Sequence, residues 1–364
     1  MARQPLTSAQ PIRWWILAPT VALALFLVPM PAWAVDEFYS RNLYPWIQTS
    51  MTALSNLVSF AVIDLLIVVV VGATVLRAIR LVGAVRSRGP VAALVQLVKR
   101  SIRFVSVAAL IFFVAWGCNY RRLPIETTLP GGHTVPVTAD RVEALVMDAN
   151  RLAATLRAGV LADGDLTVDR AASLLTGPMD RALTALNAAP LSRPGRPKAS
   201  LWLTPFWTLS GVSGMVNPFL LESIVYPDLL PFERPAVLAH EWAHLAGHAD
   251  EAEASAVGWL ACMKGPPQTA YSAMLFAITE GIGALRGDAR RRAIAAIDPG
   301  VRLDLAAISE RLRRQQPQVQ AATTRVYDTY LRANRVADGT ASYGRALTLI
   351  LAPPFREAIG EYRY

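Results

Sequence analysis

Three long apolar stretches in the first third of the chain constrain its fold more than any other feature. They cover about residues 14–34, 57–78 and 102–118, and each approaches the roughly 20 residues that a helix needs to cross the hydrocarbon core of a bilayer. They also explain why 53% of the 364 residues are hydrophobic, more than in ordinary soluble proteins. We therefore predict an integral membrane protein with three N-terminal transmembrane helices.

The first stretch has a second interpretation. Arg13, the apolar run and Ala32-Trp33-Ala34 resemble the three regions of a secretory signal peptide. Because the run is longer than the usual apolar region of such a peptide, we expect it to be retained. Asp64 lies inside the second stretch, where a carboxylate is costly. We expect it to be hydrated or paired near the outer surface, with a functional role as the alternative.

The distribution of basic residues predicts the topology. The chain has 36 Lys and Arg against 27 Asp and Glu, and nine bases before the first stretch and within residues 77–103 account for the whole surplus. Since Lys and Arg mark cytoplasmic flanks, the N-terminus and this loop are expected inside, and everything after residue 118 outside. The remaining charges balance, which argues against a nucleic-acid partner.

Residues 119–364 are long enough for one globular domain, behind a membrane domain of residues 1–118. Periodicity and composition predict helices over 142–156 and 167–188, a loop over 191–198, and short strands over 198–209 and 214–226. From residue 232 to about 350 the pattern is helical, with interruptions at Gly265-Pro266-Pro267 and Pro299-Gly300. The expected fold class is α+β, mostly helical, with a small sheet just before the motif described next.

The segment His240-Glu241-Trp242-Ala243-His244 has the pattern H-E-x-x-H. On a helix, this spacing places the two imidazoles one turn apart on one face, where they can hold one Zn²⁺, with Glu241 as general base. Three of the four histidines in the chain fall within nine residues. We therefore predict a zinc site here, with His240 and His244 as ligands.

A catalytic zinc takes a third protein ligand and keeps a position for water. Gly247 is expected to end the helix and turn the chain back toward the metal. We favour Glu251 as the third ligand because it begins the next predicted helix and is held in advance by it. Asp250, Glu253 and His248 remain alternatives, or residues that orient a ligand.

Four parts of the sequence carry a family resemblance: Trp116–Arg122, Ser213–Phe219, His240–Gly247 with Glu251-Ala-Glu-Ala, and Tyr327–Leu331 with Ser342-Tyr343. They resemble a bacterial family of membrane-anchored HExxH proteins defined as a domain of unknown function. The resemblance covers nearly the whole chain. It implies three transmembrane helices followed by a zincin-like, more narrowly gluzincin-like, zinc metallopeptidase domain. Ser255 stands where the family pattern has Asn. The departure concerns a side chain that would contact a metal ligand, and not a ligand itself.

Further residues are candidates for the cleft. Tyr327, Tyr330 and Tyr343 are candidates to stabilise an oxyanion, although for any one of them a role as a core tyrosine is the expectation we favour. Asn217 and Glu222 are candidates to line the cleft, with a turn-forming Asn-Pro and a solvated acid as the alternatives.

The segment 201–204 is expected as an edge strand that could bind a peptide. The alternatives are core packing or aromatic side chains at the bilayer interface.

Together these features predict a membrane-anchored zinc metallohydrolase in the bacterial cytoplasmic membrane, with its catalytic domain outside. Its expected partners are membrane lipid and a peptide or protein substrate in the cell envelope. A cell-wall peptide amidase would use the same chemistry. A non-catalytic scaffold with a structural or vestigial zinc site is the alternative of a different class, and a fourth protein ligand such as His248 would indicate it.

Overall fold

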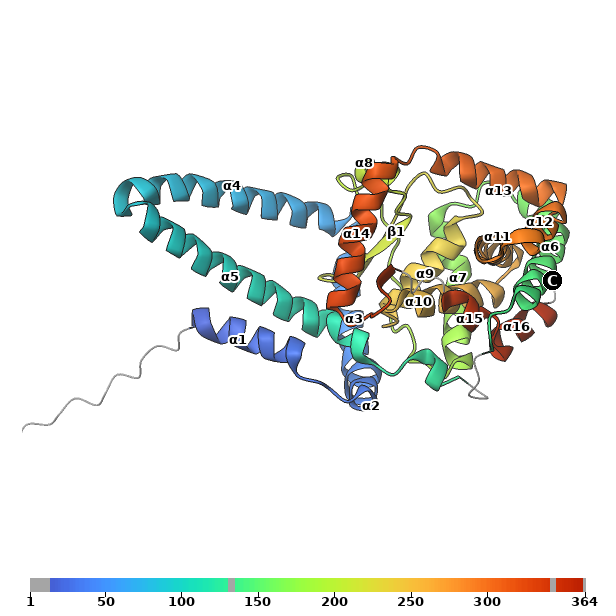
Figure 1. Ribbon diagram of the computed structural model, residues 1–364, viewed down its shortest axis with the longest axis horizontal. Helices are drawn as coiled ribbons and strands as arrows, with labels where there is room; N and C mark the ends of the chain where they lie inside the picture. Colours follow the sequence, from blue (N-terminus) through green and yellow to red (C-terminus); the bar gives the residue numbers. More distant parts are fainter. Residues whose placement is uncertain (1–13, 130–134, 341–344, 363–364) are drawn as a thin grey trace, which may run out of the picture. The chain divides into compact units, whose positions relative to one another are not determined.

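The computed structural model describes residues 14–129, 135–340 and 345–362 (Figure 1). Contacts between Cα atoms divide the chain into two compact units, one formed by residues 1–30 and 67–114 and the other by 31–66 and 115–364. The boundary therefore differs from the predicted division at residue 118. Residues 31–66 were expected in the membrane domain but are part of the larger unit.

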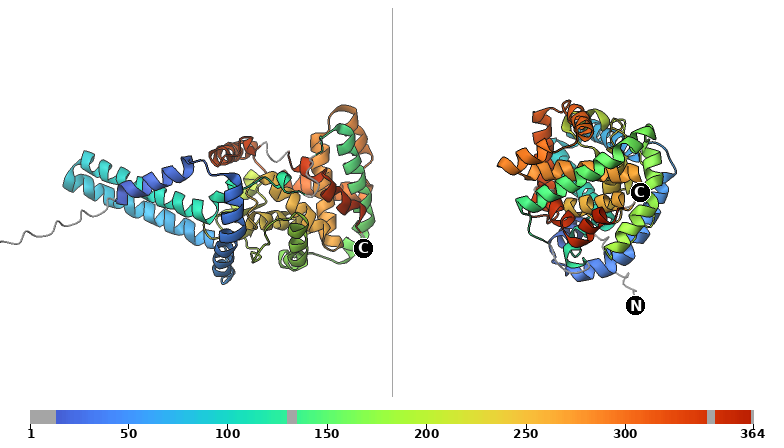
Figure 2. Two further views of the ribbon diagram at one scale, coloured as in Figure 1. Left: turned by 90° about the horizontal axis from the view of Figure 1, so that it is seen from below. Right: turned by 90° about the vertical axis from the view of Figure 1, so that its right-hand side faces the viewer.

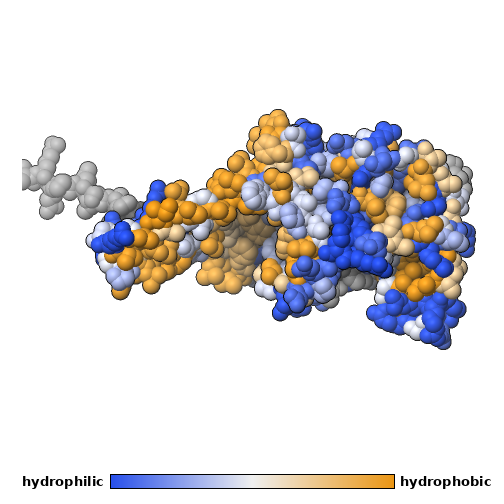
Figure 3. Space-filling view, turned by 90° about the horizontal axis from the view of Figure 1, so that it is seen from above, coloured by the Kyte–Doolittle hydropathy of each residue, from blue (hydrophilic) through white to orange (hydrophobic). Residues whose placement is uncertain are grey.

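The smaller unit contains α1 (Trp14–Leu27), most of α4 (Val62–Arg88) and nearly all of α5 (Pro90–Ala115). Gly89, with φ of +81°, separates α4 from α5. The basic region 77–103 is thus the adjoining ends of two helices, where a loop was expected. Apolar side chains cover the outside of these helices, as Figure 3 shows.

Among the described helices, α4 is the one that is long and apolar enough by itself to span a membrane. Of the three predicted spans, only the second, residues 57–78, overlaps a helix that meets this criterion by itself. The helix in the first stretch has only 14 residues, although together with the bent helical segment that follows it could form one broken span. Helix α5 is long enough, but Lys99, Arg100 and Arg103 lie near its middle. These three charges make it too polar to meet the same criterion.

The larger unit contains a sheet of two antiparallel strands, β1 (Gly214–Asn217) and β2 (Glu222–Val225). This agrees with the strands predicted over 214–226. The strand predicted over 198–209 is wrong, because only Lys198 pairs there, in a single parallel bridge to Ile224. The chain then turns into α8 (Thr204–Ser210), whose first turn contains Pro205, a residue suited to that position and unable to donate to a sheet.

Helices form the rest of the larger unit, and the predicted helices 142–156 and 167–188 correspond to α6 and α7. In chain order the elements are α2 (Ala32–Ala34), the π-helix η1 (Val35–Leu43), α3 (Tyr44–Asn56), the 3₁₀ turns η2 (Gly117–Arg121) and η3 (Ile125–Thr127), α6 (Ala139–Ala162), α7 (Val168–Ala185), α9 (Arg234–Leu245), α10 (Glu251–Met263), α11 (Pro267–Ala284), α12 (Gly287–Ala295), α13 (Pro299–Leu312), α14 (Pro317–Ala333), α15 (Ala346–Ile350) and α16 (Pro353–Gly360).

Helix α10 lies at the centre of the larger unit. All of its residues are buried, and α7, α9, α11 and α15 pack around it (Figures 1 and 2). A helix that is apolar on all sides is typical of a protein core. Two acidic residues in its first turn, Glu251 and Glu253, are nevertheless buried as well, and a buried carboxylate requires specific partners.

A buried polar network fixes the start of α4 to the sheet. The Glu222 carboxylate accepts hydrogen bonds from the backbone N–H groups of Val62 and Ile63 at 2.8 and 2.7 Å. Lys198 Nζ lies 3.0 Å from the same carboxylate, and both side chains are fully buried. Asn217 donates a further hydrogen bond to it at 3.0 Å. Glu222 therefore neutralises Lys198 and caps the amino-terminal end of α4.

Removing the cation should leave the Glu222 carboxylate buried without its counter-charge. We predict that Lys198→Met lowers the free energy of unfolding by about 3–5 kcal/mol, measured by chemical denaturation of the detergent-solubilised protein. Arg313→Met is the control, because it removes an ion pair with Glu310 whose side chains are both exposed and should cost little. Equal losses for the two variants would contradict the role of the buried pair.

Candidate metal centre

The H-E-x-x-H segment lies in the second half of α9. Pro235 occupies the first turn of this helix, where the missing N–H of proline costs nothing. His240 and His244 follow one turn apart on one face, with ring centroids separated by 4.6 Å. The helical spacing expected from the sequence is therefore present.

Gly247 ends α9 as predicted. It adopts φ of +91°, and its N–H donates to the His244 carbonyl at 2.8 Å while the N–H of His248 donates to the Ala243 carbonyl at 3.1 Å. This pair of hydrogen bonds is the Schellman motif, which requires a left-handed residue at this position. The reversal brings the start of α10 back beside the two histidines.

Glu251, the first residue of α10, completes a three-residue cluster with the histidines. Its Oε2 atom lies 3.2 Å from Nε2 of His240 and 3.4 Å from Nε2 of His244, and the ligand atoms of all three residues lie within 4.8 Å of one another. In a tetrahedral zinc site with bonds of about 2.0–2.1 Å, two ligand atoms are about 3.3 Å apart. The residues thus fit a zinc ion.

The unused hydrogen-bonding capacity of the cluster points the same way. Glu251 Oε2 is buried, and apart from the two imidazole nitrogens no described residue offers it a hydrogen bond. Nδ1 of His244 lies 2.7 Å from the carbonyl oxygen of His248, and since a carbonyl can only accept, Nδ1 carries the proton. Nε2 is then the nitrogen that faces the cluster, and a metal ion bound there would displace the proton that Glu251 otherwise stabilises on it.

The other histidine ring is held by Ser255. Its Oγ atom lies 3.3 Å from Nδ1 of His240, so Ser255 contacts a histidine of the cluster. Trp116 packs edge-on against His244, with ring centroids 5.9 Å apart. Neither contact could be expected from the spacing within the motif, because each connects residues that are far apart on different elements.

The alternatives to Glu251 have other partners. Asp250 caps α10, accepting hydrogen bonds from the N–H groups of Ala252 and Glu253 at 2.9 and 3.2 Å. Nδ1 of His248 pairs with the Glu253 carboxylate at 3.0 Å, and both side chains are buried. Among the described residues, the cluster therefore has three members, and His248 is not a fourth.

The tyrosines expected to face an oxyanion have other contacts. The Tyr327 hydroxyl from α14 donates to Oε1 of Glu251, which holds the carboxylate with Oε2 toward the histidines. The Tyr330 ring stacks on Tyr327, and its hydroxyl accepts from the Tyr120 hydroxyl at 3.2 Å. Tyr343 lies outside the described residues. Tyr327 is thus placed to orient Glu251.

Glu241 is buried next to the cluster and points toward the sheet. Within the part of the chain that the structure describes, its Oε2 has no hydrogen-bond partner. A Cβ atom at Gly214, the first residue of β1, would lie only 2.4 Å from Glu241 Oε1. Gly214 therefore provides the space that this carboxylate occupies, although nothing in the sequence around Gly214 indicates the contact.

Burial and charge shift the pKa values of these groups in different directions. Burial raises the pKa of Glu241 to about 8, so its carboxylate readily holds a proton. For His244, burial lowers the pKa, but the negative charge of Glu251 outweighs this effect and raises the pKa to about 9. Burial also opposes ionisation of Glu251, yet the charge of His244 keeps its pKa well below the usual value.

Two predicted cleft residues and the predicted edge strand are placed elsewhere. Asn217 and Glu222 are fully buried in the network at the start of α4, so the expectation that they line a cleft is wrong. Segment 201–204 forms a turn and the start of α8, and does not form an edge strand. Asp64 is paired, as expected, and accepts a hydrogen bond from Ser200 Oγ at 2.5 Å.

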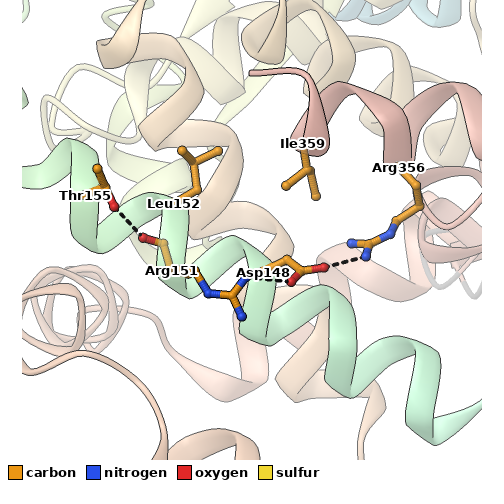
Figure 4. A pocket seen from close by; sticks show the side chains of 7 residues that line it. Asp148, Arg151, Leu152, Thr155, Arg356 and Ile359 are labelled. Atoms are coloured by element: carbon orange, nitrogen blue, oxygen red, sulfur yellow. Dashed lines mark hydrogen bonds and ion pairs between the residues drawn. The ribbon is translucent and has the colours of Figure 1, made fainter. Parts of the chain in front are cut away.

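A pocket of about 350 Å³ lies away from this cluster, between α6 and α16. Asp148, Arg151, Thr155 and Arg356 line it together with apolar residues, and Asp148 forms ion pairs with both arginines (Figure 4). None of its lining residues belongs to the histidine cluster, and its charges are already paired with each other.

Comparison with known proteins identifies the family. The family model described as "Protein of unknown function (DUF3810)" matches residues 39–351. The chain belongs to the DUF3810 family. This agrees with the resemblance to a domain of unknown function. The match includes the end of η1, both strands, α9, α10 and α14, and hence every described residue of the cluster in this DUF3810 protein. No curated protein and no solved structure matches the chain.

The close approach of α9 to α10 depends on Gly258. A Cβ atom there would lie 2.7 Å from the backbone nitrogen of His240 and 2.9 Å from the backbone carbon of Ala239. We predict that Gly258→Ala pushes the helices apart, destabilises the protein by about 1–3 kcal/mol and weakens zinc binding about tenfold or more. Denaturation and competition with a zinc chelator measure the two effects.

Gly283→Ala in α11 is the matched control, because nothing lies within 4 Å of its added Cβ atom. It should leave both zinc binding and stability unchanged or slightly raise the stability. Zinc affinity that is the same in the Gly258→Ala protein as in this control would contradict the argument.

Proposed function

We propose that this protein is a membrane-anchored zinc metallohydrolase that cleaves peptide bonds outside the cytoplasm. The observation that carries the proposal is the cluster of His240, His244 and Glu251, with the unpartnered Glu251 Oε2 at 3.2 and 3.4 Å from the two imidazole nitrogens. Two nitrogens and one carboxylate oxygen match the ligand sets of catalytic zinc sites. The fourth position would remain available for water.

The residues around the cluster fit a hydrolytic role. A zinc ion at such a site acts as a Lewis acid and makes water a nucleophile at neutral pH. Glu241, next to the cluster and free at Oε2, would take a proton from the attacking water and deliver it to the leaving amine. Its raised pKa of about 8 lies near neutral pH, where one carboxyl group can both accept and deliver a proton. Tyr327 would keep Glu251 oriented.

Strand β1 supports a peptide as the substrate. Its partner on one side is β2, and Lys198 bridges to β2 and leaves β1 as the edge. Among the described residues, none pairs with the other edge of β1. Gly214 at its start lies against Glu241. An extended peptide that added to this edge would place its backbone beside the general base.

The three-member cluster also bears on the scaffold alternative. A structural zinc site is closed by four protein ligands. His248, the nearest further candidate in sequence, is engaged by Glu253. Three candidate ligands would leave a zinc ion one position for water, and this, together with the Glu241 Oε2 that no described residue engages, favours an enzyme.

The experiment compares zinc content and hydrolysis in the full-length protein purified in detergent. We predict that Glu241→Gln keeps about one zinc per chain, because Glu241 is not a ligand, and loses activity by about 10²–10⁴-fold or more, because proton transfer fails. His240→Ala/His244→Ala should lose both. Metal analysis and mass spectrometry of a digested peptide library give the two measurements.

Glu143→Gln serves as a control for the amide substitution, since Glu143 pairs with Arg292 in an exposed ion pair. It should behave like the unchanged protein. Full zinc occupancy in the double histidine variant would refute the metal site. Unchanged cleavage by Glu241→Gln would refute its role as general base.

We also propose that the larger unit lies outside the cytoplasm. Residues 77–103 at the junction of α4 and α5 carry seven basic residues and no acidic one, which favours the cytoplasmic side for Gly89. A reporter that is active only after export should be active when fused after Tyr364 and silent when fused at Gly89. The reverse pattern would place the larger unit in the cytoplasm.

A further inference from the structure

Helix α3 in the larger unit is amphipathic, but its polar face is buried and its apolar face is exposed. It buries polar side chains, with Gln48, Thr52 and Ser55 only 1%, 0% and 3% exposed. It exposes apolar ones on the opposite face, with Trp46 at 76% and Leu54 at 67%. Helices on the surface of water-soluble proteins show the opposite pattern, so water is a poor environment for the outer face of α3.

Polar groups on the buried face form hydrogen bonds with other parts of the larger unit. The Gln48 side chain donates to the Arg193 carbonyl at 2.6 Å, and Thr52 Oγ1 donates to the Leu221 carbonyl at 2.7 Å. The Ser55 carbonyl accepts a hydrogen bond from Lys198 Nζ at 2.6 Å. These contacts fix the rotation of α3 about its axis. The exposure of its apolar face is therefore determined by the fold.

Further exposed apolar residues lie between α3 and the start of α4. Only residues 57–61 separate α3 from α4, and within them Leu57 and Phe60 are exposed. In the first turn of α4, the Asp64 carboxylate accepts hydrogen bonds from the N–H groups of Leu201 and Trp202 at 2.8 and 3.3 Å. Both of these side chains are exposed, Trp202 by 58%.

We propose that the outer face of α3 and the turn at Leu201-Trp202 lie in the interfacial region of the bilayer that α4 enters. The proposal rests on the proposed embedding of α4 in the membrane. Two separate segments, one before α4 and one about 140 residues after it in sequence, present apolar side chains at the first turn of the helix that is long and apolar enough to span.

A lipid interface fits these side chains better than a protein partner. Trp and Leu on one face of a helix, with polar groups at its margins, are typical of helices that lie in the plane of a membrane interface. Ser50 on α3, and Glu37 and Asn42 on η1 just before it, are exposed, which is compatible with the headgroup level but not with the hydrocarbon centre. The larger unit would then rest on the bilayer surface.

Site-directed spin labelling of the full-length protein in liposomes tests the placement. The native cysteines Cys118 and Cys262 are both buried, so labels at Leu54→Cys and Trp202→Cys can be read against the labelled parent protein. We expect both labels to be shielded several-fold from a water-soluble nickel chelate and to collide with oxygen dissolved in the bilayer. Leu303→Cys on α13 is the matched control, because Leu303 is 67% exposed, the same as Leu54.

A label at Val71→Cys in α4 tests the membrane span separately from the interfacial placement of α3 and Trp202. If Val71 is shielded while Leu54 and Trp202 are as accessible to the nickel chelate as Leu303, the interfacial placement is wrong and the membrane span stands. If Val71 is itself accessible, the span fails and the interfacial placement fails with it. Shielding of Leu54 that appears only at high protein density, and disappears in dilute liposomes, would indicate a second copy of the protein and also overturn the proposal.

Discussion

The candidate site depends on the contact between α9 and α10 at Gly258. The histidines are on one helix and Glu251 is on the other, so their separation is determined by how closely the two backbones approach. Any side chain at residue 258 would meet the backbone of α9 at His240, within the motif itself. The Schellman turn at Gly247 sets the direction of α10, and Gly258 sets its distance. Both glycines are needed for three ligand atoms within 4.8 Å.

Near this contact, the three acidic residues at the start of α10 point in different directions and have different partners. Asp250 caps the helix, Glu251 faces the histidines, and Glu253 pairs with His248 and accepts from the N–H of Ile125 at 2.9 Å. The His248 carbonyl in turn fixes the ring of His244. The buried carboxylate of Glu253 thus supports the candidate cluster indirectly, by holding the loop that orients the His244 ring.

The sequence predicted the parts of this arrangement that are local. The periodicity of α6 and α7, the end of α9 at Gly247 and the convergence of Glu251 on the histidines all follow from spacing along one or two turns of helix. The errors concern long-range contacts. Glu222 and Asn217 lie beside the motif in sequence, but Lys198 and the start of α4 recruit them to a network that no local pattern reveals. Pro205 and the pairing of Asp64 likewise turn an aromatic segment, expected as a strand, into a bend and a helix.

The capping of α4 by Glu222 also has a consequence for the order in which the protein is made. Val62 and its cap are 160 residues apart in the chain. At roughly 5–20 residues per second, ribosomes need roughly 8–30 s to synthesise this interval. During that time the first amides of α4 lack their carboxylate partner. Asp64 lacks its hydrogen bond from Ser200 for almost as long. The start of α4 is therefore synthesised well before the sheet that caps it can form, and until then its first amides need another hydrogen-bond partner, such as water.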